Sequence, residues 1–144
     1  MASQPKNVTE QFMRKELIKH FDRNANITPI ETGQTMRGVP DLHIRSNSCD
    51  WFVELKQVKA PAKDSTPIRV PFRAGQLSWM EAHERKGGHC ALIVYLAFEY
   101  FIVVSVWNMR MVYANKAELI ELSEYHGSLI AIPTRIWDHD YTKR

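Results

Sequence analysis

The feature that most constrains the fold is a long apolar stretch in the second half of the chain, from Cys90 to Val106. The stretch is interrupted by Glu99 and is rich in β-branched and aromatic residues, which favour strands. We therefore interpret it as two adjacent strands, His89–Leu96 and 101–106, and not as a membrane-spanning helix, which needs about 20 consecutive apolar residues. The first of these strands is apolar throughout, which is typical of a buried strand.

Helical spacing of apolar residues appears in other parts of the chain. In the first such segment Met13, Leu17 and Phe21 recur at intervals of four residues, which indicates an amphipathic helix. In the second, Leu77 and Met80 face inward and Gly87-Gly88 ends the helix. The predicted helices are Glu10–Phe21, 73–84 and 116–125.

Further strands are predicted in the first half of the chain. Pro29 places the segment 27–32 at an edge or a bend, because proline cannot donate a ladder hydrogen bond. A second strand begins at Asp41, directly after Pro40, and a third spans 51–58. Residues 60–71 contain three prolines and are expected to form a loop, whereas 110–113 is expected to form a hairpin or meander with 101–106. The pattern predicts an α/β fold.

Composition bounds the organisation of the chain. The 144 residues, of which 44% are hydrophobic and 24% charged, are those of one globular domain spanning 1–144, with a core at about 9–96 and a C-terminal extension at 97–144 that contains strands and a helix. Cys49 and Cys90 are isolated, so we expect no disulfide and a reducing, cytoplasmic location. The polar N-terminus shows no signal peptide, and no membrane association is expected.

The residues that carry chemistry are Asp41, Glu54 and Lys56. Because strand side chains alternate, Glu54 and Lys56 share one face of their strand, while Trp51, Val53 and Leu55 share the other. Two carboxylates on neighbouring strands can chelate a hard divalent cation, and a lysine beside them can hold a hydrolytic water. The alternatives without a catalytic role are that Asp41 starts a strand and accepts a turn hydrogen bond, and that Glu54 and Lys56 form an exposed cross-strand pair.

The pattern Pro40-Asp41 followed, after twelve further residues, by Glu54-Leu55-Lys56 resembles the PD-(D/E)xK nuclease superfamily. Among its members the chain most resembles small phage and archaeal Holliday-junction-resolvase-like proteins and the VRR-NUC group, over about residues 9–96. The resemblance implies a restriction-endonuclease-like core of order αβββαβ, in which a mixed central β-sheet is flanked by α-helices. It also implies a metal-dependent endodeoxyribonuclease that uses Mg²⁺, with Mn²⁺ able to substitute.

The resemblance assigns roles to further residues. Asp41, Glu54 and the carbonyl of Leu55 would hold the metal, and Lys56 would orient the attacking water. Glu10 on the first helix would lie near the metal, with Glu16 as the competing choice, or would be an ordinary first-turn glutamate. Gln76 would contact the active site or the phosphate; otherwise it is a surface residue.

A basic segment follows the candidate site and suits a DNA backbone, although a solvated loop is the alternative. It carries positive side chains against the single acid Asp64. Homodimers are also expected if the protein resolves junctions, because two sites must then cut opposite strands. The expected DNA-binding residues are Arg37, Lys59, Lys63, Arg69 and Arg73, and the residues expected to supply an apolar dimer contact are Trp107, Met109, Met111 and Tyr113.

The sequence therefore leads to a structure-selective DNA nuclease of phage type, with junction or other branched DNA as substrates and recombination as one possible setting. Two other classes of function stay open. One is a nucleic-acid-binding module that keeps the fold without cutting, and the other is a partner-recruiting protein that uses the last third of the chain.

Overall fold

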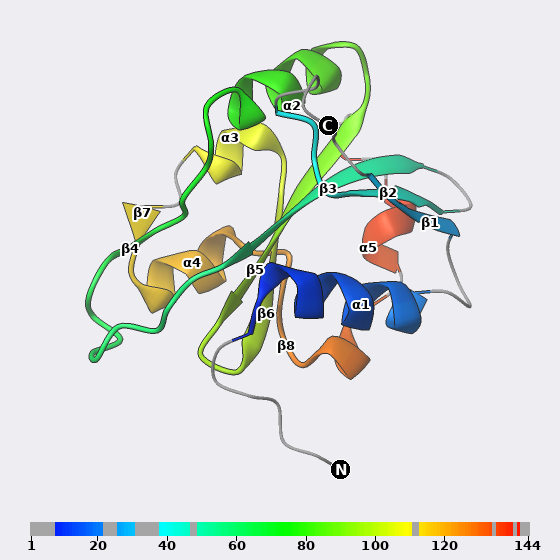
Figure 1. The fold of residues 1–144 in the computed structure, drawn as a ribbon. Coiled ribbons are helices and arrows are strands. Elements are labelled where there is room, and N and C mark those ends of the chain that lie inside the picture. The colour runs from blue at the N-terminus through cyan, green and yellow to red at the C-terminus, as the bar shows by residue number, and fades with distance from the viewer. Residues whose placement is uncertain are drawn as a thin grey trace.

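The computed structural model describes residues 8–21, 26–30, 38–46, 49–110, 113–133, 135–139 and 141. Its central sheet is mixed and six-stranded, with helices on both faces (Figure 1). The helices are α1 (Glu10–Phe21), α2 (Gln76–Arg85), α3 (Val106–Met109), α4 (Lys116–Leu122) and α5 (Arg135–Asp138), with a 3₁₀ turn at Leu129–Ala131. The strands are β1 (Asn26–Pro29), β2 (Leu42–Arg45), β3 (Asp50–Gln57), β4 (Ile68–Arg69), β5 (His89–Leu96), β6 (Glu99–Val104), β7 (Tyr113–Ala114) and β8 (Tyr125–Gly127).

The strand order in the main sheet is β1-β2-β3-β5-β6-β8. Strands β3 and β5 are parallel and are connected by a crossover through α2, whereas the other neighbours are antiparallel. Strand β1 lies at one edge, as Pro29 predicts, and β4 and β7 form a separate two-stranded sheet. The mixed α/β fold, with the order αβββαβ in the main sheet up to Leu96, is therefore confirmed.

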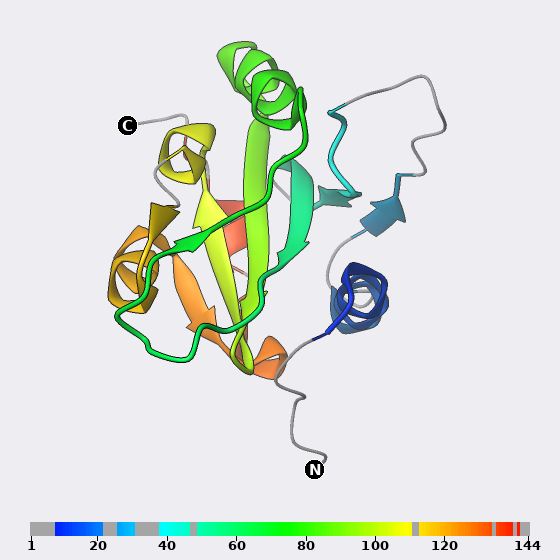
Figure 2. The ribbon, with the colours of Figure 1, turned by 60° about the vertical axis from the view of Figure 1, so that its left-hand side comes forward.

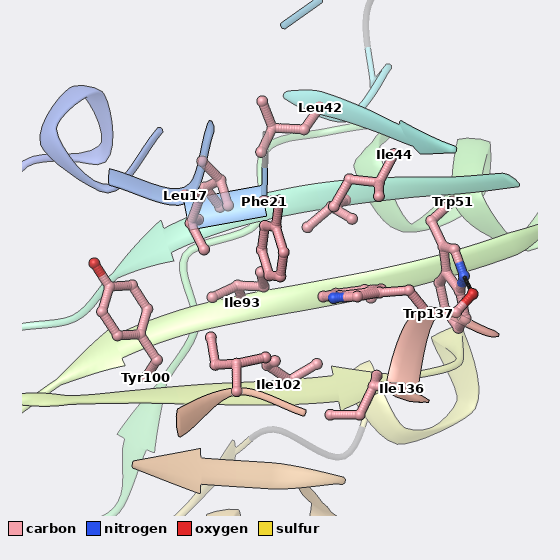
Figure 3. Close-up of a cluster of buried hydrophobic side chains, with 14 of the residues drawn as sticks. Leu17, Phe21, Leu42, Ile44, Trp51, Ile93, Tyr100, Ile102, Ile136 and Trp137 are labelled. Atoms are coloured by element: carbon pink, nitrogen blue, oxygen red, sulfur yellow. Dashed lines mark hydrogen bonds between the residues drawn. The ribbon is translucent and has the colours of Figure 1, made fainter. Parts of the chain in front are cut away.

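Each face of the sheet carries its own hydrophobic core. On one face α1 and α5 pack against the strands, and Figure 3 shows Phe21 and Trp137 among the side chains that meet there. The indole nitrogen of Trp51 donates to the carbonyl oxygen of Trp137 at 2.8 Å, which ties the start of β3 to α5. On the other face lie α2, α3 and α4, which Figure 2 shows separated from α1 by the sheet. In the part of the chain that the structure describes, no helix combines the length and apolarity needed to cross a membrane.

Local periodicity predicts the first helix and the strand after α2 correctly. Helix α1 has the predicted bounds, and Met13, Leu17 and Phe21 are its buried residues. Strand β5 also has the predicted bounds, and it is buried almost throughout. In both segments the apolar pattern within the segment itself determines the structure, so no distant contact is needed to predict it.

Other boundaries differ from the prediction. Strand β2 begins at Leu42, one residue after Asp41, and the loop at 60–71 contains β4. Helix α2 begins at Gln76 and not at residue 73, because Gly75 adopts the left-handed conformation (φ 88°) and interrupts the helical path. Loop residues before it form a turn in which the Gln76 amide donates to the Arg73 carbonyl.

The predicted hairpin between 101–106 and 110–113 is wrong. Strand β6 pairs with β5 through the tight turn at Ala97 and Phe98, and a short helix, α3, follows it. The Glu84 carboxylate of α2 accepts hydrogen bonds from the Val106 amide at 2.8 Å and the Ser105 hydroxyl at 3.3 Å, so a distant residue caps this helix.

The third predicted helix, 116–125, ends at Leu122, because the chain enters β8 at Tyr125. Met109 on α3 is buried, so the prediction that it contributes to a dimer contact is wrong. Met111 lies outside the described residues.

Candidate active site

Strand β3 presents Glu54 and Lys56 on one face of the sheet, as its alternation predicts. Each is only 2% exposed, and Leu92 and Val94 of β5 are their neighbours in register. The Lys56 ammonium nitrogen lies 3.9 Å from Glu54 Oε1. The alternative of an exposed pair is therefore wrong: this is a buried pair with apolar neighbours, where electrostatic interactions are far less screened than on a surface.

Asp41 reaches the same place from the neighbouring strand. The antiparallel register pairs Leu42 with Val53, so one more step places Asp41 beside Glu54. Its Oδ2 accepts a hydrogen bond from the Leu55 amide at 2.9 Å, and its backbone carbonyl accepts one from the Ile30 amide at 2.9 Å. These two bonds fix both ends of the residue.

The electrostatics of Glu54 are unusual. Burial raises the pKa of Glu54 to about 10, and a hydrogen bond with Asp41, the charge of Asp41 and the charge of Glu10 act in the same direction, whereas Lys56 lowers it. In addition, Glu54 Oε2 is buried without a hydrogen-bond partner among the described residues. A buried polar atom left unpaired costs about 1–3 kcal/mol, so a cation that took this oxygen as a ligand would remove that cost.

The donors at this position fit a hard divalent cation. Two adjacent carboxyl groups supply oxygen ligands, and Asp41 and Leu55 line a cavity of about 210 Å³. The N–H and C=O of a strand residue point to the same side of the strand. Because the Leu55 amide donates to Asp41, the Leu55 carbonyl also points towards Asp41. Within the described ranges no cluster of three or more His, Cys, Asp or Glu side chains is placed to hold a metal. Mg²⁺ needs only one or two carboxylates, because it retains several waters.

The structure places Glu10 nearer this site than Glu16. Glu10, on the first turn of α1, lines the same cavity as Asp41 and contributes to the electrostatics of Glu54. The charge of Glu16 instead affects Tyr100, whose pKa is raised mainly by burial. Arg14 also lines the cavity and was not singled out from the sequence, where it reads as one of several charged residues on a helix.

Gln76 is buried (6% exposed), so the alternative of a surface residue is wrong. Its side-chain oxygen accepts a hydrogen bond from the Arg73 amide at 2.7 Å and thereby fixes the turn before α2. This turn approaches the strand that carries Asp41: a Cβ added to Gly38 would lie 2.4 Å from the Gly75 carbonyl oxygen. The N-terminus of α2 is therefore held beside the segment that leads into Asp41.

The predicted DNA-binding residues separate into two groups. Arg69 and Arg73 line a groove of about 870 Å³, which also includes Arg110. Lys59 and Lys63 are exposed on the connection from β3 to β4 and are not among the described residues that line the groove. Arg37 lies outside the described residues. No sequence pattern predicts the place of Arg110, because the pairing of β4 with β7 brings its segment to the groove.

The comparisons with known proteins bear on the fold. No protein-family model matches the sequence, and a search of curated proteins finds no match either. Among solved structures, Hjc, a Holliday junction resolvase from the archaeal hyperthermophile Archaeoglobus fulgidus, matches with a TM-score of 0.52 and 14% sequence identity, over 80% of this chain and 93% of that chain. The match confirms the restriction-endonuclease-like fold that the Pro-Asp and Glu-x-Lys residues imply.

Proposed function

We propose that the chain is a Mg²⁺-dependent DNA endonuclease that hydrolyses phosphodiester bonds. The observation that carries the proposal is the group formed by Asp41, Glu54 and Lys56, which brings two carboxyl groups and an ammonium group together beside a small cavity. A hydrophobic core does not need such a group, because burying polar and charged atoms costs free energy unless they are fully paired. The fold shared with a Holliday junction resolvase supports the same function.

The residues of the site have separate proposed roles in metal binding and catalysis. Asp41 and Glu54, with the Leu55 carbonyl, would hold Mg²⁺, and Mn²⁺ substitutes because it prefers the same oxygen ligands. When bound, the cation activates water and neutralises charge that develops on the scissile phosphate. Lys56 holds the attacking water and stabilises the anionic transition state as a compact point charge.

The neighbouring residues prepare the site before the substrate arrives. The amides of Leu55 and Ile30 fix Asp41, so its carboxylate needs little reorientation. Glu10 adds a carboxylate to the cavity beside Asp41, which offsets the positive charge of Arg14 there, and Gln76 holds the N-terminus of α2 in place near the site. These two are positioning residues.

DNA binding would proceed mainly through phosphates and would depend on its structure and on salt. The basic residues proposed for these contacts are Arg37, Lys59, Lys63, Arg69 and Arg73. A four-way junction is one specific substrate and requires a homodimer with two sites on opposite strands. Trp107, which is 67% exposed on α3, offers an apolar contact for such a dimer.

The test compares cleavage of a four-way junction, a linear duplex and a single strand in Mg²⁺, in Mn²⁺ and in EDTA. We expect cutting of at least one DNA with either metal and none in EDTA. Lys56→Met preserves the length of the side chain but removes its charge, and Asp41→Asn preserves the shape but removes a ligand. Each should slow cutting by about a hundredfold or more while DNA binding stays measurable.

A matched control is Asp138→Asn, an exposed residue of α5, which packs at the opposite end of β3 and should cut normally. Cutting in EDTA, or undiminished cutting by folded Asp41→Asn protein, contradicts the proposal. A wild-type protein that binds DNA without cutting favours the non-cleaving module. A protein that does neither favours a partner-recruiting role.

A further inference from the structure

The groove beside the candidate active site combines two kinds of surface. It is lined by Arg69, Arg73 and Arg110, and no acidic residue is among the described residues that line it. Its remaining surface includes Phe72, Leu77 and Tyr113. Tyr113 is 68% exposed, which is unusual for a large aromatic side chain, and it lies directly opposite Arg69 in the register of β4 and β7.

The arginines differ in how far they are already paired. Arg110 forms an ion pair with Glu81, which also pairs with Arg85 at 3.5 Å. Within the described ranges neither Arg69 nor Arg73 has a carboxylate partner at ion-pairing distance, and both are exposed. Arg69 and Arg73 therefore give the groove a positive charge that no described carboxylate neutralises, which suits a ligand with several phosphates.

The apolar and aromatic part of the groove distinguishes between two forms of DNA. In a duplex the bases are stacked inside and the phosphates lie outside, so a duplex uses basic residues but leaves an aromatic surface unused. A single strand offers both groups, because its phosphates bind the arginines and its unpaired bases stack on an aromatic ring. Cross-strand neighbours project on the same face of a sheet, so Arg69 and Tyr113 can contact one nucleotide together.

Two residues of the groove lie next to the candidate active site. The Phe72 ring, which lines the groove, has its centroid 6.0 Å from the Lys56 ammonium nitrogen. Gly75, which also lines it, is the residue that approaches Gly38 in the segment before Asp41. A strand in the groove would thus lie against Phe72 and Gly75, the groove residues nearest to Lys56 and to the segment before Asp41.

We propose that this groove binds a single-stranded segment of the DNA substrate, with phosphates on Arg69, Arg73 and Arg110 and a base stacked on Tyr113. The inference rests on the proposed nuclease function and specifies its substrate: branched DNA with an unpaired arm next to the cleaved bond. A fully paired duplex would bind through phosphates alone.

The test measures binding in EDTA, where cleavage cannot interfere. The probes are a fluorescein-labelled single-stranded oligo-dT, a duplex of the same length, and a duplex with an oligo-dT arm, followed by fluorescence anisotropy. For the wild-type protein we expect tighter binding of the two probes that contain a single strand. Tyr113→Ala should weaken binding of those probes by about tenfold, because it removes the stacking of one base. Arg73→Ala should weaken it by about as much, because it removes a phosphate contact. Binding of the duplex should change by less than about twofold with Tyr113→Ala.

The chain supplies matched controls for both variants. Phe12→Ala removes an exposed aromatic ring on α1 that does not line the groove, and Arg85→Ala removes a guanidinium that pairs with the same Glu81 but lies outside the groove. Both should bind single strands normally. All four residues are exposed, so the variants should fold, and circular dichroism checks this.

The groove proposal is overturned if Tyr113→Ala binds single strands normally, if it weakens duplex and single strand equally, or if the wild type prefers the duplex. These outcomes are separate from failure of the nuclease function. If the wild-type protein binds oligo-dT through Tyr113 but never cuts in Mg²⁺ or Mn²⁺, the groove proposal is supported and the nuclease proposal is contradicted.

Discussion

Replacing Glu54 by glutamine should stabilise the metal-free protein, and the size of the effect should depend on pH. Burial raises the pKa of Glu54 from its ordinary value of 4.5 to about 10 in the folded protein. Between these two values the folded protein keeps a proton that the unfolded chain has lost, so stability falls as pH rises, by about 1.4 kcal/mol per pH unit. At about pH 7.5, roughly three units above 4.5, protonating Glu54 opposes folding by about 4 kcal/mol.

Glu54→Gln preserves the shape of the side chain and has no proton to take up. We expect its free energy of unfolding to exceed that of the wild type by up to about 4 kcal/mol at pH 7.5, and the difference to shrink towards zero near pH 4.5. Urea denaturation in EDTA at several pH values between about 5 and 8 measures this. The matched control is Glu121→Gln, which makes the same chemical change at an exposed position on α4 and should follow the wild type at every pH.

Two results would refute this reasoning. If the stability curves of wild type and Glu54→Gln are parallel in pH, Glu54 is ionised in the folded protein and burial does not control it. If Mg²⁺ stabilises both proteins equally, Glu54 is not a ligand. We expect instead that Mg²⁺ stabilises the wild type increasingly as pH rises, because a ligating carboxylate must be deprotonated, and that the variant loses this effect.

Two glycines make further predictions. Gly38→Ala places a Cβ 2.4 Å from the Gly75 carbonyl oxygen and strains a residue with φ +87°. It should therefore lower the free energy of unfolding by about 2 kcal/mol or more and displace Asp41. The control is Gly75→Ala, which has φ +88° but open space around its Cβ and should cost about 1 kcal/mol. Thermal unfolding and nuclease assays compare the two, and equal effects would show that the close approach is unimportant. Gly88→Ala places a Cβ 2.1 Å from His83 Nε2, and the His83 ring cannot easily move because it is stacked on Trp79. We expect urea denaturation to show a free energy of unfolding lower by about 1–3 kcal/mol. A variant as stable as the wild type would mean that the ring rotates freely.

The sequence predicts those parts of the fold that depend on neighbouring residues in the chain. Helix α1 and strand β5 follow from apolar spacing alone, and Glu54 and Lys56 share a face because strand side chains alternate. By contrast, the sequence Val106-Trp107-Asn108-Met109 favours a strand as readily as a helix. Helix α3 forms there because Glu84, more than twenty residues earlier, accepts hydrogen bonds at its N-terminus. Such a contact leaves no periodic signal.

The candidate site shows the same division. Asp41, Glu54 and Lys56 are predicted from order and spacing, and the structure brings them together. Their burial is not predictable from β3 itself, because the period of a strand does not tell what covers each face. The groove also cannot be predicted from the sequence, because Arg69 and Tyr113 are far apart in the chain and become neighbours only when β4 pairs with β7.

The last third of the chain contributes mainly to the interior, and this bears on whether it recruits a partner. Strand β6 covers the edge of β5 that would otherwise be unpaired, and Trp137 receives hydrogen bonds at its carbonyl from Trp51 and Ser46. Removing these residues would expose β5 and release the start of β3, the strand that carries Glu54 and Lys56. Most of the described apolar side chains of this region lie in the two cores, and its large apolar side chains described as exposed are Phe98, Trp107 and Tyr113. The region therefore helps to hold β5 and the start of β3 in place.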